Sequence, residues 1–518
     1  MKHTFIINIP SEQTGERGCK VTVDGLFMYK ENTSFSDSVR SFVLEFYNGT
    51  HDFNECYGAY RITMNLYDKD IFFSDNSGMM RFYINDKKQK FYKSLAASEP
   101  DKKNRIPNYS AIAQFLYYGC VYRDYTILES VRLSNPNYYY IYNNNTIIKK
   151  SKKLTPMSSY SNKDISISKL ISQALSHCEG EKGCTITGGI DSRSVLANLL
   201  DLGYYPQLAI TGHDSQIDVQ IAEEIANKTG LNLTVVTDEI DQDNWLDLSI
   251  EAADGQNGIC GIYRLKKLAM LLQEKGIQLQ FGGVAGEMYK NSFINQDFPF
   301  YYGKPRWKRF FIYKVGTFDF SDSLFGESLR AKTKKLPSQM LHWLEKHKGK
   351  NKADAYLNAG YEIMQYRCNL VVNMFENHIT SYNPLMERKL ASYAFGINPY
   401  ELEMQAFQRK EVSEHFKSIK TIKTDRNLTC DYKKRYFEFI QSYFFLIKVA
   451  SQRVFFRNKV DIRIDNCFEE GHKCKEFFEA LNYTKKMGIL NPEVNIADVP
   501  AGLSDRLFTI GTFFSNSL

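Results

Sequence analysis

The sequence predicts an α+β domain over residues 1–145, rich in strands, and an α/β domain over residues 164–518 that is helical from about residue 320. Three observations support this division. A chain of 518 residues is too long for one compact core, because single cores stop growing near roughly 250–300 residues. The first part is rich in short β-branched stretches, and the middle alternates strand-like and helix-like segments.

The strand signals of the first domain are short apolar stretches separated by Gly, Asn, Asp and Ser. They cover residues 4–9, 19–29, 58–68, 70–75 and 137–143. Residues 143–163 are polar and basic with one proline, so we expect an exposed connection between the domains there.

Strands and helices alternate in the second domain. In chain order we expect a helix at 165–178, a strand at 183–187, a helix at 192–203, a strand at 206–211, a helix at 215–230, a strand at 231–237, a helix at 262–276 and a strand at 277–283. Such alternation predicts a parallel sheet covered on both faces. After about residue 320 we expect amphipathic helices and no further strand.

Charge and cysteine content limit the partners. The net charge of +7 comes from 66 basic and 59 acidic residues, a small imbalance, and the pI near 8.6 is below that of a typical nucleic-acid-binding domain, so nucleic acid is not an expected partner. Ten irregularly spaced cysteines favour reduced thiols. The chain has no signal-peptide core and no apolar run long enough to cross a bilayer. We therefore expect a soluble, cytoplasmic protein with no membrane partner.

A glycine-rich turn at residues 187–192 is the most informative motif. Gly188 and Gly189 lie between a predicted strand and a predicted helix, so backbone N–H groups and the helix N-terminus can approach an anion. Thr187 and Ser192 add hydroxyl donors. Asp191 beside phosphate would need a divalent cation between the charges, so we expect it to be a magnesium ligand.

The alternative interpretation of this turn is a helix capped by Asp191 or Ser192 without any ligand. Its place at the carboxyl end of the first strand of a parallel α/β domain favours ligand binding, because such folds bind ligands at that edge. The turn matches neither the GxxxxGK[ST] nor the GxGxxG pattern, which disfavours those nucleotide-binding classes.

Four ordered stretches resemble the asparagine synthetase family, which includes β-lactam synthetases and lasso-peptide cyclases. TGGIDSR is similar to that family's SGGxDS pyrophosphate loop, and residues 278–291 and 381–401 are similar to its SGxGxDE loop and PFLD segment. Residues 209–237 resemble the strand beside the adenine and the elements after it. The resemblance implies a PP-loop synthetase domain, of the adenine nucleotide alpha hydrolase type, that binds ATP. It adds four residues to the nucleotide site: Ile210, Thr211, Gly282 and Gly283.

The N-terminal part resembles the glutaminase domain of the same family, over residues 53–68, 74–85 and 126–142. This implies an Ntn-hydrolase-like sandwich. Family glutaminases use a cysteine at residue 1 whose own amino group is the base. Here Lys2 follows Met1, and Cys19 could replace that cysteine only after cleavage of a propeptide. We therefore expect no glutaminase activity.

A second departure concerns the metal site. Gly286 occupies the position of a family aspartate that ligates magnesium, although Glu287 remains. Asp218, Asp254 or Glu287 could supply the missing carboxylate. Glu287 could equally be only an acid that starts a helix after a glycine turn.

The resemblance implies an AMP-forming carbon–nitrogen ligase that uses ATP and Mg²⁺. A substrate carboxylate would form an acyl-adenylate, and an amine would then attack it. The implied catalytic residues are Asp191, Glu287 and a lysine, either Lys410 or Lys423, while Arg193 could contact phosphate or lie on the surface.

Several features of the reaction stay open. The substrate could be a small molecule or a peptide, and a partner protein could deliver it. The amine could belong to the substrate, as in macrolactam or β-lactam closure, to a second molecule, or be free ammonia. The alternative function is a non-catalytic binding or scaffold protein.

Overall fold

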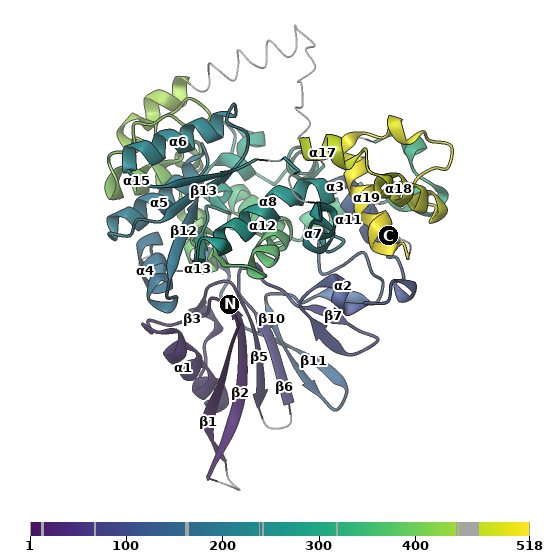
Figure 1. Ribbon diagram of the computed structural model, residues 1–518. Coiled ribbons are helices and arrows are strands. Elements are labelled where there is room, and N and C mark those ends of the chain that lie inside the picture. Colours follow the sequence, from purple (N-terminus) through teal and green to yellow (C-terminus); the bar gives the residue numbers. More distant parts are fainter. Residues whose placement is uncertain are drawn as a thin grey trace.

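The computed structural model describes residues 2–11, 15–66, 69–160, 165–237, 239–240, 243–316, 320–441, 444 and 466–516. An antiparallel sheet from the N-terminal part of the chain fans out on one side, and a helix-rich body with a parallel sheet lies on the other (Figure 1). No helix within the described ranges is long and apolar enough to cross a membrane.

The N-terminal sheet has six strands in the order β1-β2-β5-β6-β10-β11, paired antiparallel. They are β1 (Lys2–Ser11), β2 (Gly15–Gly25), β5 (Tyr60–Leu66), β6 (Lys69–Ser74), β10 (Tyr138–Asn143) and β11 (Thr146–Ser151). Helix α1 (Phe35–Asn48) packs against it through a cluster that includes Val21, Phe42 and Phe73. The prediction of a strand-rich first domain is confirmed.

Strand β11 lies inside the segment that the sequence predicts to be an exposed connection. Asn144 and Asn145 both have positive φ, 48° and 58°, and form a tight turn between β10 and β11. Asparagine tolerates this left-handed conformation, and consecutive positive φ values suit a two-residue hairpin. The N-terminal sheet therefore continues to Ser151, because the polar residues of 146–151 form an edge strand.

Smaller elements connect this sheet to the rest of the molecule. Two short sheets have the orders β3-β4 and β8-β7-β9. Their strands are β3 (Met28–Tyr29), β4 (Cys56–Tyr57), β7 (Tyr83–Asn85), β8 (Lys90–Tyr92) and β9 (Val131–Leu133). Helices α2 (Leu95–Ser98) and α3 (Tyr109–Tyr118) lie between β8 and β9 in the chain.

The second sheet is entirely parallel, in the order β14-β13-β12-β15-β16. Its strands are β12 (Glu181–Thr185), β13 (Gln207–Thr211), β14 (Leu233–Val236), β15 (Ile277–Phe281) and β16 (Thr380–Tyr382). The strand order reverses between β12 and β15. Open parallel sheets bind their ligands outside the carboxyl ends of the strands at such a reversal.

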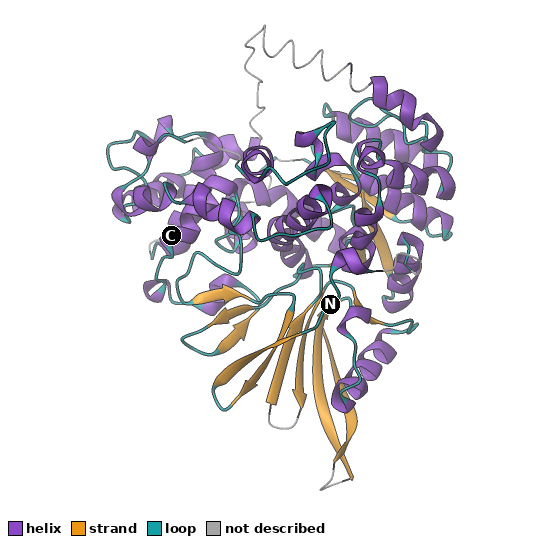
Figure 2. Ribbon diagram, turned by 180° about the vertical axis from the view of Figure 1, so that it is seen from behind, coloured by secondary structure: helices purple, strands orange, loops and turns teal. Residues whose placement is uncertain are grey.

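Helices cover this sheet on both sides (Figure 2). Those linked to it are α4 (Ile167–His177), α5 (Ile190–Asp201), α6 (Ile217–Thr229), α7 (Trp245–Ala253) and α8 (Ile259–Glu274). Right-handed crossovers place α5 and α6 on one face and α8 on the other. The predicted parallel sheet is confirmed, with β12 and α5 each beginning two residues earlier than the strand and helix expected there.

Strand β16 contradicts the expectation of no strand after residue 320. Its three residues are too few to produce a period-two pattern in the sequence. The α-helices that the structure describes after β15 are α9 (Trp307–Phe310), α10 (Glu327–Thr333), α11 (Leu336–Leu344), α12 (Lys352–Glu376), α13 (Arg388–Ala391), α14 (Pro399–Glu403), α15 (Ala406–His415), α17 (Asn466–Gly471), α18 (Lys475–Lys486) and α19 (Ala501–Phe514).

The two parts of the chain share buried surface. Helix α3, from the first 145 residues, packs against α10 and also against α19, the C-terminal helix that lies beside it in Figure 1. The larger hydrophobic cluster includes Phe115 and Leu116 of α3 together with Leu329 of α10 and Leu507 of α19. The core of the second part thus contains residues from both sides of the predicted domain boundary.

Candidate functional site

The glycine-rich turn lies between the end of β12 at Thr185 and the start of α5 at Ile190. Gly189 is the N-cap of α5 and has no side chain with which to accept a hydrogen bond. The first N–H groups of this helix therefore lack a capping side chain, which suits an anionic ligand.

Three N–H groups of the turn already have partners, and one of them, the Gly189 N–H, donates to Thr187 Oγ1 at 3.2 Å. The Thr187 N–H donates to Ser192 Oγ at 3.1 Å, and the Gly188 N–H donates to Asp218 Oδ1 at 2.8 Å. Asp218 lies in the first turn of α6. The Asp218 carboxylate accepts from an N–H group that was expected to bind phosphate. An anionic side chain of the protein itself therefore lies at the turn in this arrangement.

The loop after β15 packs directly on the start of α5. A Cβ atom at Gly283 would lie 2.6 Å from the backbone nitrogen of Ser192, and one at Gly286 would lie 2.1 Å from Cγ of Asp191. Gly282 packs in the same way on Asn383, which follows β16. Gly282, Gly283 and Gly286 are thus required by the close packing of this loop on its neighbours.

Asp191 lies in the first turn of α5, with both carboxylate oxygens engaged. Lys290 donates from Nζ to Oδ2, and Gln408 donates from Nε2 to Oδ1, each at 2.5 Å. Gln408 also donates to the carbonyl of Gly286 at 2.9 Å. Burial raises the pKa of the Asp191 carboxyl, with a further rise from Glu287 and an opposing effect of the Lys290 ammonium.

A magnesium ion does not fit these residues as they are arranged. Asp191 is paired with an ammonium, and Gly286 contributes no carboxylate. Among the described residues, no group of three or more His, Cys, Asp or Glu side chains is placed to hold a metal ion. Magnesium prefers several oxygen ligands in octahedral geometry, and amide and ammonium N–H groups cannot provide them.

The three carboxylates that could replace the missing ligand lie in different places. Asp254 accepts hydrogen bonds from the N–H groups of Leu95 and Ala96 at 2.7 and 2.8 Å, so it caps α2. Asp218 holds Gly188. Glu287 is the one that influences Asp191 electrostatically. Asp254 is therefore excluded from this site.

Arg193 differs from both expectations for it. Its side chain is buried, and its guanidinium donates to the carbonyls of Ile422, Lys423 and Gly188 at 2.7, 2.8 and 3.0 Å. These bonds fasten the glycine-rich turn to residues 422–423. Arg193 therefore has a structural role here and is neither a surface residue nor a phosphate ligand.

The two candidate lysines occupy different surroundings. Lys423 is exposed, and its backbone carbonyl accepts from Arg193. Two residues later, the Asp425 N–H donates to the Gly188 carbonyl of the turn at 3.2 Å. Lys410 lines a separate hollow with Tyr393 and Tyr432. The structure therefore places the backbone of Lys423 beside the turn and Lys410 at the separate hollow.

Three residues that the sequence analysis missed lie at the site. Lys290 and Gln408 contact Asp191, and Arg426 is close enough to lower its pKa by charge attraction. Lys290 lies four residues after Gly286 in the chain. Arg426 directly follows Asp425, whose N–H donates to the Gly188 carbonyl. Gln408 carried no signal, because α15 reaches α5 only in the folded chain.

A cavity of about 310 Å³ opens at the carboxyl ends of β12, β13, β15 and β16. Its polar edge includes Thr187, Thr211, Asp218 and Gly282. Most of its wall is apolar: Ile186, Ala209, Ile210, Leu265, Leu268, Val284, Val371, Val372 and Phe375. Thr185, Gln280, Arg367, Ser381 and Asn383 also line it. Its size and its mainly apolar wall with polar groups among it are typical of a small-molecule site.

A larger cavity of about 400 Å³ lies elsewhere, between the N-terminal part and α7, α12 and α19. Arg61, Lys93 and Asp254 line it, and none of the predicted nucleotide-binding residues does. The cavity at the strand ends is therefore the candidate site, because it contains the residues that the sequence places around a nucleotide.

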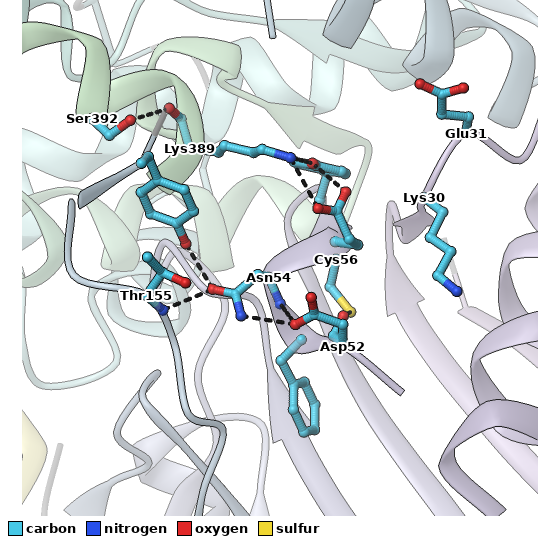
Figure 3. Close-up of polar contacts among 12 residues, drawn as sticks. Lys30, Glu31, Asp52, Asn54, Cys56, Thr155, Lys389 and Ser392 are labelled. Carbon is cyan, nitrogen blue, oxygen red and sulfur yellow. Dashed lines mark hydrogen bonds and ion pairs between the residues drawn. The ribbon is translucent and has the colours of Figure 1, made fainter. Parts of the chain in front are cut away.

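The N-terminal part contacts this body through polar side chains. Lys389 of α13 donates to Glu55 Oε1 at 2.9 Å and to the Tyr57 hydroxyl at 3.2 Å, and Asn54 accepts from the Thr155 N–H at 2.8 Å (Figure 3). Cys56 lies in the same region and is buried.

Cys19 lies in β2 and is 1% exposed. Burial raises the pKa of its thiol to about 11, so it is a neutral core residue at neutral pH. Cys56 and Cys120 are also buried free thiols.

Comparison of the chain with models of known protein families and with curated protein sequences found no match.

Proposed function

We propose that this chain is an ATP-dependent carbon–nitrogen ligase that forms AMP and pyrophosphate. The observation that carries the proposal is the cavity at the point where the strand order of the parallel sheet reverses. This cavity joins an apolar slot, lined by residues such as Ile210 and Val371, to the glycine-rich turn. The slot beside Ile210 and Thr211 suits an adenine ring. Thr187 and Gly282 at its edge lead from the slot to the start of α5.

The proposed reaction has two steps. A carboxylate oxygen of the substrate attacks the α-phosphorus of ATP, the bond to pyrophosphate breaks, and an acyl-adenylate forms. An amine nitrogen then attacks the activated carbonyl carbon, loses a proton and displaces AMP. The uncapped start of α5 supplies N–H donors for the phosphates, Arg426 supplies positive charge near Asp191, and Lys423 is the proposed lysine of the amide-forming step.

Glutamine is not proposed as the source of the amine. In the described residues of the N-terminal part, the cysteines Cys19, Cys56 and Cys120 are buried, and burial raises the pKa of each thiol. A buried neutral thiol is a poor nucleophile. The amine is therefore a group of the carboxylate substrate, a group of a second molecule, or free ammonia. A peptide or a small molecule remains the substrate class.

A binding or scaffold protein is the second candidate. It is favoured by the Asp218 carboxylate on the Gly188 N–H, since a ligand anion must displace that contact before it can bind. The two candidates differ in one observable property, which is release of pyrophosphate from ATP.

The test incubates the protein with ATP and pools of amino acids and peptides and measures pyrophosphate and AMP. We expect release that falls by at least about 100-fold in Asp191→Ala, because preorganised charge at such sites contributes that much to rate. Thermal melting of the variant checks its fold. ATP binding without release in any pool would favour a non-catalytic binding protein, and no ATP binding would contradict the ligase and leave the scaffold alternative.

A further inference from the structure

Lys290 places a positive charge at the start of α5. It follows the second glycine loop, and its ammonium forms an ion pair with Asp191 at 2.5 Å. The two side chains are 13% and 17% exposed, so the pair is largely withdrawn from water. Such a pair is held in a fixed place, because separating it would leave a charge poorly solvated.

The surroundings of Asp191 leave no room for a second carboxylate. A Cβ atom at Gly286 would lie 2.1 Å from Asp191 Cγ, so no side chain fits at that position while Asp191 keeps its place. Gln408 fills the other side by donating to Asp191 and to the Gly286 carbonyl. The carboxylate is thus surrounded by N–H donors and orients the lysine.

The ammonium of Lys290 retains capacity for an anion. An ammonium has three N–H donors, and the contact with Asp191 Oδ2 uses one of them. Lysine binds phosphate as a compact point charge in other nucleotide sites. Lys290 also lies on the side of the turn where α5 begins, and Arg426 adds charge in the same neighbourhood.

We propose that Lys290 supplies the positive charge for the phosphates of ATP in place of a magnesium ion bound by the protein, and that Asp191 is its positioning residue. The inference rests on the proposed function, since it assumes that ATP is the ligand. It explains why the carboxylate at Asp191 coexists with a glycine at position 286: the acid orients a cation that belongs to the chain.

The experiment measures ATP binding by calorimetry in excess EDTA and in excess Mg²⁺. We expect wild-type affinity to differ by less than about 3-fold between the two conditions, because the chain's own cation meets the phosphates. Lys290→Met should weaken binding by about 10-fold or more in both, and Lys290→Arg should recover most of it. Lys314→Met is the matched control, since that half-buried lysine donates to Asn295 away from the turn.

Two results would overturn the inference: wild-type binding of ATP that is lost in EDTA, or unchanged affinity in Lys290→Met. The comparison of EDTA with Mg²⁺ on wild-type protein needs no variant, so it tests metal independence even if Lys290→Met does not fold, and the affinity of Lys290→Arg then tests the side chain. Absence of ATP binding in both conditions would instead contradict the proposed function, and the inference with it.

Discussion

At the residue scale, the fate of a charged side chain depends on contacts that are distant in sequence. Arg193 directly follows the glycine-rich turn, and its neighbours in the chain could not distinguish a phosphate ligand from a surface residue. Its partners are the carbonyls of Ile422 and Lys423, more than two hundred residues away. By contrast, Gly188 and Ser192 have roles that follow from local chemistry, and the sequence was sufficient to identify them as the turn.

Arg193→Met should destabilise the protein by about 2–4 kcal/mol, because three carbonyls, two of them in buried hydrogen bonds, lose a charged donor. Urea unfolding monitored by circular dichroism measures this. Arg309→Met is the control, because that side chain is 45% exposed and lies 3.8 Å from Asp297. Its effect should stay within about 1 kcal/mol. Equal effects of the two substitutions would contradict a structural role for Arg193.

At the element scale, short strands and their flanking loops were the least predictable features. The strand β16 has three residues, and its identity comes only from pairing with β15. Longer strands and helices such as β13 and α6 were predictable, because their apolar periodicity and the glycine after α6 are local signals. The cavity at the strand ends follows from strand order, which the sequence alone does not state.

Glu387, in the turn after β16, connects that element to the N-terminal part. It accepts a hydrogen bond from the Gly58 N–H at 2.6 Å. Burial raises the pKa of its carboxyl from 4.5 to about 8. Between these values the folded protein binds the proton more tightly than the unfolded chain does. The contribution of Glu387 to the free energy of unfolding therefore falls as pH rises through this window. Above about pH 8 the buried carboxylate is ionised, and its full destabilising effect is present.

Glu387→Gln keeps the acceptor for Gly58 and removes the titration. Relative to wild type, the variant should become more stable by roughly 1–3 kcal/mol on going from about pH 5 to about pH 9. Urea unfolding at the two pH values measures the change. If the difference in the free energy of unfolding between variant and wild type is the same at both pH values, this carboxyl does not titrate with a raised pKa.

At the scale of the whole molecule, the two parts were predictable as classes but not as independent units. The composition and the change of pattern near residue 145 predicted strands followed by an α/β body. The packing of α3 on α10 and α19 was not predictable, because helix periodicity shows which face is apolar and not which element covers it. Phe115 and Leu116 are consequently part of the core of the second part.

Removal of residues 1–160 should leave a chain that does not unfold cooperatively. The truncation deletes α3 and exposes the apolar faces of α10 and α19, including Leu329 and Leu507. Exposed contiguous apolar surface favours aggregation. Thermal melting and size-exclusion chromatography test this. A truncated monomer that melts cooperatively near the temperature of the intact protein would contradict the shared core.

The central claim is that a nucleotide binds in the cavity at the reversal of the parallel sheet. Photolabelling with 8-azido-ATP, followed by mass spectrometry of peptides, tests it most directly. We predict label within residues 207–211 or 371–375, suppressed by excess ATP and by Val371→Trp, which fills the cavity, but not by Ile312→Trp on the surface. Label confined to other segments, or label that persists in excess ATP, would contradict the claim.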